Sequence, residues 1–397
     1  AGETEGTADA HAEYFSTVAA AVFDDIRSGE QIKAIARTEA DLDNLRSGFR
    51  RATDSNPDAA RKYLECLWFI HEIKSWFPAG RDLFAEAAST AEQSTVEGTD
   101  RIAALSKAKQ SWYISLMGSA EDGLVLASAA HEAVMELDPT GADACLAQQC
   151  LNIGLLFLNP EGIREGTKEA VSLAVRDGDE WWRMTMSVWE AYSYISEPSD
   201  IGVQMALDGI EYFSSLGDHW VQVWPLGFLG LLAEQSGDLT EARRRYEQSL
   251  AIGRDIGFGR IIQYSLNSLG RVTTEQGDFE QAEKYLGEGL ALSLDGGQER
   301  EVLAGIVDFA AIRIGQERWA EASRLLAVVA SDPLRTQRTA FASAAIIDLA
   351  NELQGRLEQA VGPEGSAQPV PGSETTSSRD VAVALVAEQQ VLLSSSD

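Results

Sequence analysis

The chain has 397 residues, of which 45% are hydrophobic, enough for several globular domains or for one long array of repeats. Its 62 acidic residues against 32 basic ones give a formal net charge of −30 at pH 7. This excess argues against a surface for nucleic acid or for an anionic membrane, because both contacts depend on Lys and Arg. The longest apolar run, residues 153–158, is too short to span a membrane, so we expect a cytoplasmic protein.

A helical lead-in is predicted over residues 1–54. Apolar residues at helical spacing predict one helix over residues 9–27 and a second over residues 30–53, which stops at Asp54-Ser55-Asn56-Pro57. The chain starts with Ala1 rather than Met, so we expect that it is a piece cut from a longer protein.

Residues 55–333 are predicted to form about seven helix pairs. The first four pairs follow one another at intervals near forty residues, and Gly217, Gly257 and Gly297 place the last three in strict register. The predicted pairs are 61–77 with 80–94, 99–117 with 121–137, 142–158 with 161–176, 180–195 with 200–216, and those that begin near Trp220, Ile261 and Glu301.

The clearest repeat lies between Gly227 and Ala330 and has a period of about forty residues. A weaker third copy keeps Trp319 and Ala322 at the corresponding positions. In the two strong copies, Gly230, Gly237, Asp238, Ala242 and Leu250 recur as Gly270, Gly277, Asp278, Ala282 and Leu290.

Each copy predicts a helical hairpin. Gly237 supplies the positive φ of a tight turn, and Asp238 is placed to cap the second helix. Leu239 and its copies Phe279 and Trp319 are predicted to fill the gap between the two helices of a pair. One hairpin cannot bury its own apolar face, so each hairpin must stack on its neighbours.

These residues resemble the tetratricopeptide repeat (TPR) pattern. Leu229-Gly230, Gly237-Asp238, Ala242, Tyr246 and Leu250 carry the resemblance, and the second copy repeats most of it. The usual unit has 34 residues, whereas this one has about forty, and the Pro that normally ends the unit is missing. The resemblance implies an all-α fold, a right-handed α-solenoid of TPR-like helix hairpins.

A second resemblance covers nearly the whole chain. His11-Ala12-Glu13-Tyr14-Phe15, residues 39–46 and Leu67-Trp68-Phe69 are similar to the start of the TPR-like sensor region of bacterial STAND-type signalling ATPases. Members of that family include LuxR-type transcriptional regulators and class III adenylate cyclases. The resemblance implies a sensor whose ATP site lies outside this chain, because no Gly-rich phosphate loop is present here.

Beyond the repeats, the composition changes twice. Residues 334–360 are predicted to form a capping helix, and residues 361–378, rich in Gly, Pro, Ser, Thr and Glu, a flexible linker. Residues 379–397 are predicted to form a C-terminal helix and tail. That helix packs either on the solenoid or on a partner.

We find no residue pattern for catalysis. The four histidines lie far apart, and no Gly-x-Ser-x-Gly turn is present. The three cysteines, Cys66, Cys145 and Cys150, form no disulfide framework and are expected to be reduced core thiols. The sequence therefore predicts neither enzyme activity nor a cofactor or metal site.

What remains is a binding surface on the first helices of the pairs. The candidate groove residues are Tyr194, Trp224, Tyr264, Asn267 and Arg271. Asn267 and Arg271 lie four residues apart, so they either grip a carboxylate of a ligand or form an ordinary solvated pair. The acidic surroundings favour a cationic or neutral partner, with Arg271 as an exception.

Three functions fit these observations. The first is a sensor and interaction module of a larger bacterial signalling or transcription-regulating ATPase, which binds a small-molecule inducer, a protein, or other domains of its parent. The second is a free-standing TPR adaptor that binds peptide tails in its groove. The third, an all-helical enzyme, would need a polar pocket that the sequence does not reveal.

Overall fold

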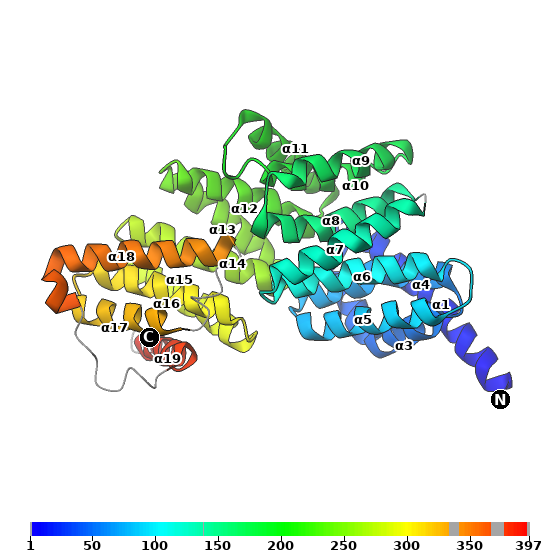
Figure 1. Ribbon diagram of the computed structural model, residues 1–397, viewed down its shortest axis with the longest axis horizontal. Helices are drawn as coiled ribbons and strands as arrows, with labels where there is room; N and C mark the ends of the chain where they lie inside the picture. The colour runs from blue at the N-terminus through cyan, green and yellow to red at the C-terminus, as the bar shows by residue number, and fades with distance from the viewer. Residues whose placement is uncertain (1, 138, 333–340, 367–376, 395–397) are drawn as a thin grey trace. The chain divides into compact units, whose positions relative to one another are not determined.

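The computed structural model describes residues 2–137, 139–332, 341–366 and 377–394, and all regular elements in these ranges are α-helices (Figure 1). The prediction of an all-α helical-repeat solenoid is confirmed. The helices that open the chain are α1 (Gly2–Arg27), α2 (Gln31–Ala40) and α3 (Leu42–Thr53).

Fourteen helices then follow among the described residues, in the part of the chain where about seven pairs are predicted. They are α4 (Pro57–Ile73), α5 (Phe77–Gln93), α6 (Thr99–Leu116), α7 (Ala120–Glu136), α8 (Gly141–Leu158), α9 (Gly162–Arg176), α10 (Glu180–Tyr192), α11 (Asp200–Leu216), α12 (His219–Gln235), α13 (Leu239–Ile256), α14 (Gly259–Glu275), α15 (Phe279–Asp295), α16 (Glu299–Gly315) and α17 (Trp319–Ser331). The last two helices are α18 (Phe341–Ser366) and α19 (Ser378–Ser394).

The chain folds into two compact units. Unit 1 comprises residues 1–228 and 252–258, and unit 2 comprises residues 229–251 and 259–397. The division falls inside the clearest repeat, whereas the sequence predicts one uninterrupted set of repeats over residues 55–333.

The turns of the strong repeat copies have the predicted geometry. Gly237 and Gly277 both have φ of 79°. The side chain of Asp238 accepts a hydrogen bond from the backbone N–H of Glu241 at 3.0 Å, and Asp278 caps α15 in the same way. These caps satisfy N–H groups that have no partner inside the helix, so the same two residue types both end one helix and start the next.

The third copy of the turn uses less favourable residues. Glu317 occupies the position of Gly237 and Gly277 and still adopts φ of 59°. Arg318 occupies the N-cap of α17 and makes no side-chain cap hydrogen bond. Packing of α16 against α17 therefore imposes a backbone conformation that a residue with a Cβ adopts only at a cost.

Small residues allow the helices of a hairpin to approach. A Cβ at Gly230 would lie 2.7 Å from the Tyr246 ring, and one at Gly270 would lie 2.3 Å from the Leu286 side chain. The Phe279 ring lies against Gly315 of α16, where a Cβ would be 2.4 Å away. Phe279 thus fills a space toward the following pair, whereas the sequence analysis placed it between the helices of its own pair.

The lead-in contains one more break than predicted. The single helix expected over residues 30–53 is divided at Asp41, which has φ of −105° and ψ of 11°. The N–H of Asp41 bonds to the carbonyl of Arg37, and the carbonyl of Asp41 accepts the N–H of Leu45. Asp41 therefore ends α2 and begins α3, a position that suits a short acidic residue at a helix N-terminus.

Unit 1 brings its first and last helices together. The side chain of Gln31 donates to Asp218 Oδ1 at 2.6 Å, and the N–H of Trp220 donates to Gln31 Oε1 at 3.0 Å. Asp218 Oδ2 also accepts from Trp181 Nε1 at 2.7 Å. At Gly29, with φ of 83°, a Cβ would lie 2.7 Å from the carbonyl oxygen of Leu216. The lead-in is thus joined to α10 and to the turn between α11 and α12.

The C-terminal helices cover the last repeat pair of unit 2. α18 packs on α16 and α17, and α19 packs on α15 and α16, with Ala382 and Leu385 buried in the shared core. Gln389 donates to Glu283 Oε2 at 3.0 Å, and Glu283 also pairs with the buried Arg313. The sequence left open whether the C-terminal helix packs on the solenoid or on a partner. Here it packs on unit 2.

The predicted boundaries near the C-terminus shift. α18 runs to Ser366, past residue 360 where the capping helix is expected to end, although Gly362 interrupts it with φ of 78° and ψ of 163°. Most of the predicted linker, residues 367–376, lies outside the described residues.

Among the described residues, α8 is the one helix long and apolar enough to cross a membrane, with a mean hydropathy of 1.2. It is 67% buried within the protein and carries Asp143, Gln148 and Asn152 as fully buried polar residues. These features are typical of a core helix.

Candidate functional site

Three of the five predicted groove residues lie on α14 in unit 2. Tyr264 is 37% exposed and meets the ring of Tyr246 edge-on, with ring centroids 6.1 Å apart. Asn267 is half-buried, and its Oδ1 would lie 2.2 Å from a Cβ placed on Gly289 of α15. Asn267 thus packs against the second helix of its own pair.

Arg271, the third residue on α14, already has a carboxylate partner. Its Nε donates to Glu234 Oε1 at 3.0 Å, and its Nη2 contacts Glu234 Oε2 at 3.4 Å and Ser268 Oγ at 3.1 Å. The hydroxyl of Tyr246 also donates to Glu234 Oε2, at 2.7 Å. The sequence missed Glu234 because this residue lies 37 positions upstream, on α12.

The other two predicted residues belong to unit 1. Tyr194 follows the end of α10, and the guanidinium of Arg164 lies 4.2 Å from the centre of its ring. Trp224 meets the ring of Phe258 edge-on at 5.9 Å, and its carbonyl accepts the hydroxyl of Tyr192 at 2.7 Å. Both aromatic rings are half-buried and packed.

Asp308 on α16 is a further member of the group around Arg271, which the sequence analysis did not identify. It is 5% exposed, and it makes no hydrogen bond or ion pair with any residue that the structure describes. Burial raises the pKa of Asp308 to about 7, against a lowering by Arg271, and Glu234 raises it further. We call Glu234, Tyr246, Ser268, Arg271 and Asp308 the Arg271 cluster.

The sequence contains a signal for Asp308. Residues 302–312 are apolar except for this one acidic residue, and all of them except residues 304 and 311 are buried. A charged residue within such a run must be paired or serve a function, because burying an unpaired charge is costly.

The edge of the Arg271 cluster is acidic. Burial raises the pKa of Glu275 on α14, and Glu234 and Glu352 on α18 raise it further while Arg271 opposes the shift. Within the cluster, Arg271 is the single cation and is committed to Glu234. The local field therefore favours a cation over an anion.

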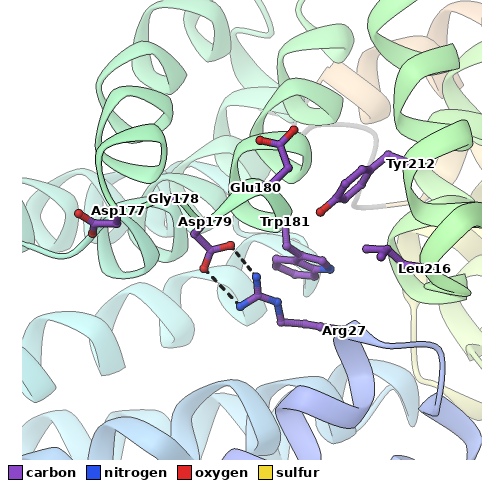
Figure 2. Close-up of a pocket in the computed structure, with 8 residues that line it drawn as sticks. All are labelled: Arg27, Asp177, Gly178, Asp179, Glu180, Trp181, Tyr212 and Leu216. Carbon is purple, nitrogen blue, oxygen red and sulfur yellow. Dashed lines mark hydrogen bonds and ion pairs between the residues drawn. The ribbon is translucent and has the colours of Figure 1, made fainter.

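A separate pocket of about 420 Å³ lies in unit 1 (Figure 2). Arg27 of α1 reaches across it and makes two contacts with Asp179, at 2.5 and 3.3 Å. The guanidinium also lies 4.8 Å from the centre of the Trp181 ring. Tyr212 and Leu216 of α11 form the other side in Figure 2.

The charged side chains that line this pocket already have partners within the protein. Asp179 caps α10 by accepting the N–H of Trp182, and Glu180 pairs with Arg183. Asp177 accepts the N–H of Gly141 at 2.6 Å. The pocket therefore lies beside the ion pair that joins α1 to α10, and its polar groups stabilise the fold.

The interior of unit 1 contains polar groups among tryptophans. Lys109 is fully buried, its Nζ lies 3.5 Å from the centre of the Trp68 ring, and burial lowers its pKa. Trp112 donates to Glu72 at 2.9 Å, and Trp68 and Trp220 meet edge-on at 4.9 Å. The conspicuous tryptophans of this unit are therefore packed core residues, as are Trp181 and Trp182.

No metal centre is found within the described ranges, where no three His, Cys, Asp or Glu residues are placed to hold an ion. The three cysteines are free and buried. Burial raises the pKa of Cys66 to about 12 and that of Cys150 to about 11, and it raises the pKa of Cys145 as well. These thiols are therefore protonated and unreactive at neutral pH.

Residues 223–295 match the tetratricopeptide repeat family model, and this span includes the two strong repeat copies and most of the Arg271 cluster. No curated protein matches the chain.

Three solved structures are similar in fold. A Rap protein complexed with competence and sporulation factor has a TM-score of 0.59 at 14% identity, over 95% of this chain and 99% of that one. NprR in complex with its cognate peptide NprX has a TM-score of 0.50 at 14% identity, over 82% and 96%. A STAND protein with a tetratricopeptide repeat sensor, from Pyrococcus horikoshii, has a TM-score of 0.52 at 14% identity. The match covers 91% of this chain and 53% of that protein.

Proposed function

We propose that the chain is a non-catalytic helical-repeat module that binds a peptide or an extended protein segment at the Arg271 cluster of unit 2. The observation that carries the proposal is Asp308, a buried carboxylate that makes no hydrogen bond or ion pair among the described residues and lies close enough to Arg271 for their charges to interact. Burying such a group without a partner lowers the stability of the fold, so it is more typical of a recognition site than of a purely structural core.

The fold supports a peptide ligand. Two of the similar structures are complexes, the Rap protein with competence and sporulation factor and NprR with its cognate peptide NprX. Helical repeats suit extended ligands because successive hairpins present side chains at regular intervals along one face. An exposed tyrosine beside charged groups is also the residue type that most often anchors a protein interface.

A second candidate is the sensor region of a STAND-type signalling ATPase. The likeness to a STAND protein that contains a tetratricopeptide repeat sensor favours it, as does the sequence resemblance noted above. In that case the same cluster would bind an inducer or another domain of the parent, and binding would shift the balance between two states of the parent. The two candidates share the site and differ in its occupant.

The test is a selection from a random peptide library on the immobilised chain, followed by measurement of affinity for the selected peptides. We expect Tyr264→Ala and Arg271→Gln to weaken binding about tenfold or more. Arg244→Ala is the matched control, since Arg244 lies on α13 and pairs only with Glu241 and Gln248 in the described structure. Equal affinity of all four proteins would overturn the proposed site.

A thermal-shift screen with sugars, nucleotides and amino acids distinguishes the second candidate, the inducer sensor, from the peptide-binding module. A ligand at a hundred times its dissociation constant adds about 2.7 kcal/mol to the free energy of unfolding. A small-molecule ligand that stabilises the wild-type chain but not Arg271→Gln would favour the inducer sensor over the peptide-binding module.

A further inference from the structure

We infer that Asp308 receives a cationic group of the bound partner, an ammonium or a guanidinium, and that this contact selects basic peptides. The inference rests on the proposed function and specifies its ligand. It reverses the expectation that Arg271 binds a carboxylate, because the structure places a carboxylate of the chain itself on Arg271.

The charges of the Arg271 cluster do not balance. The Arg271 cluster holds two carboxylates, those of Glu234 and Asp308, and one guanidinium. Both Nε and Nη2 of Arg271 contact Glu234, which also accepts from Tyr246. The Glu234 carboxylate therefore has its partners, whereas that of Asp308 has no hydrogen bond or ion pair among the described residues.

The other charges around Asp308 are mostly negative. The charged groups that act on Asp308 are Arg271 of α14 and Glu234 of α12, and Glu275 of α14 is itself close enough to Glu234 and to Glu352 of α18 for their charges to interact. Apart from Arg271, these groups are acidic. An incoming anion would therefore meet repulsion, whereas an incoming cation would complete a two-by-two set of charges.

Tyr264 adds an exposed aromatic surface near these charges. Its ring is 37% exposed and lies on the same helix as Arg271, with one side against Tyr246. An exposed aromatic ring near an acidic cluster suits the alkyl stem and charged end of a Lys or Arg side chain.

A cation at Asp308 has a consequence for protons. Burial raises the pKa of Asp308 to about 7, so part of this carboxyl is protonated near neutral pH. A cationic ligand favours the ionised form, so binding near neutral pH releases protons. Binding of a neutral ligand elsewhere on the face releases none from this group.

The experiment repeats the library selection at pH 8 and low salt on three full-length chains, wild type, Asp308→Asn and Glu280→Gln. Glu280 lies on α15, is well exposed and pairs with Lys284, so its substitution removes the same charge from another face. We expect wild type and Glu280→Gln to enrich peptides with Lys or Arg at one fixed position. Asp308→Asn should lose that preference.

The outcomes separate the two levels of the argument. Enrichment of neutral or acidic peptides on wild type would overturn the cation inference and leave the peptide-binding module intact. Absence of any enrichment on all three chains would overturn the proposed function itself. Enrichment of basic peptides with equal strength on Asp308→Asn would place the acidic contact elsewhere and also overturn the inference.

A second measurement resolves the contact. One selected peptide is compared with its copy in which the cationic residue is norleucine, on wild type and on Asp308→Asn, by calorimetry in two buffers of different ionisation enthalpy. We expect the norleucine peptide to bind wild type about tenfold to a hundredfold more weakly, with no such difference on Asp308→Asn. Proton release should be absent when the norleucine peptide binds wild type and when either peptide binds Asp308→Asn. Equal losses for both peptides on Asp308→Asn would indicate a structural role only.

Spermidine and N-terminally acetylated peptides identify the source of the cation. Competition by spermidine alone indicates that any ammonium suffices. Loss of binding on acetylation of the N-terminus indicates a terminal amine rather than a side chain.

Discussion

Gln31 and Asp218 are 187 residues apart in sequence, and the amide of one donates to the carboxylate of the other at 2.6 Å. Both side chains are buried, and their remaining atoms bind Trp220, Val221, Trp181 and Ile26. Burial raises the pKa of Asp218, while these donors oppose the shift. The pair therefore joins the lead-in to the fifth helix pair by a network with every partner inside the protein.

Gln31→Ala should destabilise unit 1. The substitution leaves the N–H of Trp220 without its acceptor and removes one donor from Asp218, a loss of about 1–3 kcal/mol. Eight of the nine tryptophans lie in unit 1, so tryptophan fluorescence during urea denaturation reports this unit. Gln93→Ala, which removes a hydrogen bond between exposed residues, should change the midpoint little. Similar shifts for both variants would show that the connection contributes no more than a surface contact.

Gly29→Ala should be more damaging than Gly178→Ala, although both residues have positive φ, 83° and 70°. A methyl group at position 178 meets nothing within 4 Å, and we expect a loss of about 1 kcal/mol. At position 29 it would lie 2.7 Å from the Leu216 carbonyl oxygen and 3.1 Å from Gly217 Cα, which adds a backbone clash. Urea denaturation of the two variants gives the difference, and equal losses would mean that the Gly29 contact relaxes freely.

Glu317→Gly should stabilise unit 2. Glu317 adopts φ of 59° in the turn where the two stronger repeat copies have Gly, and a glycine there avoids a strain of about 1 kcal/mol. Calorimetry should show a higher melting temperature for the transition of unit 2. The matched control is Gly277→Glu, which introduces the same mismatch into the preceding turn and should lower that temperature.

Asp308→Asn should make stability less dependent on pH. The folded pKa of Asp308, about 7, lies above its ordinary value of 3.8, so the native state binds more protons than the unfolded state between these values. Wild type therefore loses stability relative to the variant as pH rises from about 4 to 8, by on the order of 2–4 kcal/mol, and the difference levels off above about pH 8. Thermal unfolding across pH 4–8, with Glu280→Gln as control, measures it. A constant difference across this range would contradict the assigned titration.

The three thiols should be unreactive in the native chain. Ellman's reagent at pH 8 should react with less than about a tenth of a thiol per chain, because all three cysteines are buried and their pKa values are raised. In 6 M guanidinium chloride all three should react. Fast modification of a thiol in the native chain would show local opening of unit 1, where all three lie.

Much of the helical hairpin pattern could be predicted because its determinants are local. Gly237-Asp238 and Gly277-Asp278 carry both the turn and the cap within two residues. The break at Asp41 could not be predicted, since neither Gly nor Pro marks it and the helical spacing of apolar residues continues across it.

The contacts of the candidate site residues could not be predicted, because their partners come from other helices. Tyr264, Asn267 and Arg271 were identified from their spacing on one helix, but spacing cannot show that Glu234 already occupies Arg271 or that Asn267 lies on Gly289. Asp308 was missed, although its position in an apolar run was visible in the sequence.

The docking of α18 and α19 also limits how the array can vary in length. Their apolar residues, including Leu353, Leu357, Ala382 and Leu385, are buried with those of α15, α16 and α17, where another hairpin would otherwise stack. Duplication of a forty-residue copy downstream of α17 would leave either the new hairpin or the two C-terminal helices without an apolar surface to cover. Duplication between complete copies, at a turn such as Gly297, would keep both ends of the stack closed. We therefore expect insertion of a complete copy at the Gly297 turn to be tolerated better than insertion after α17.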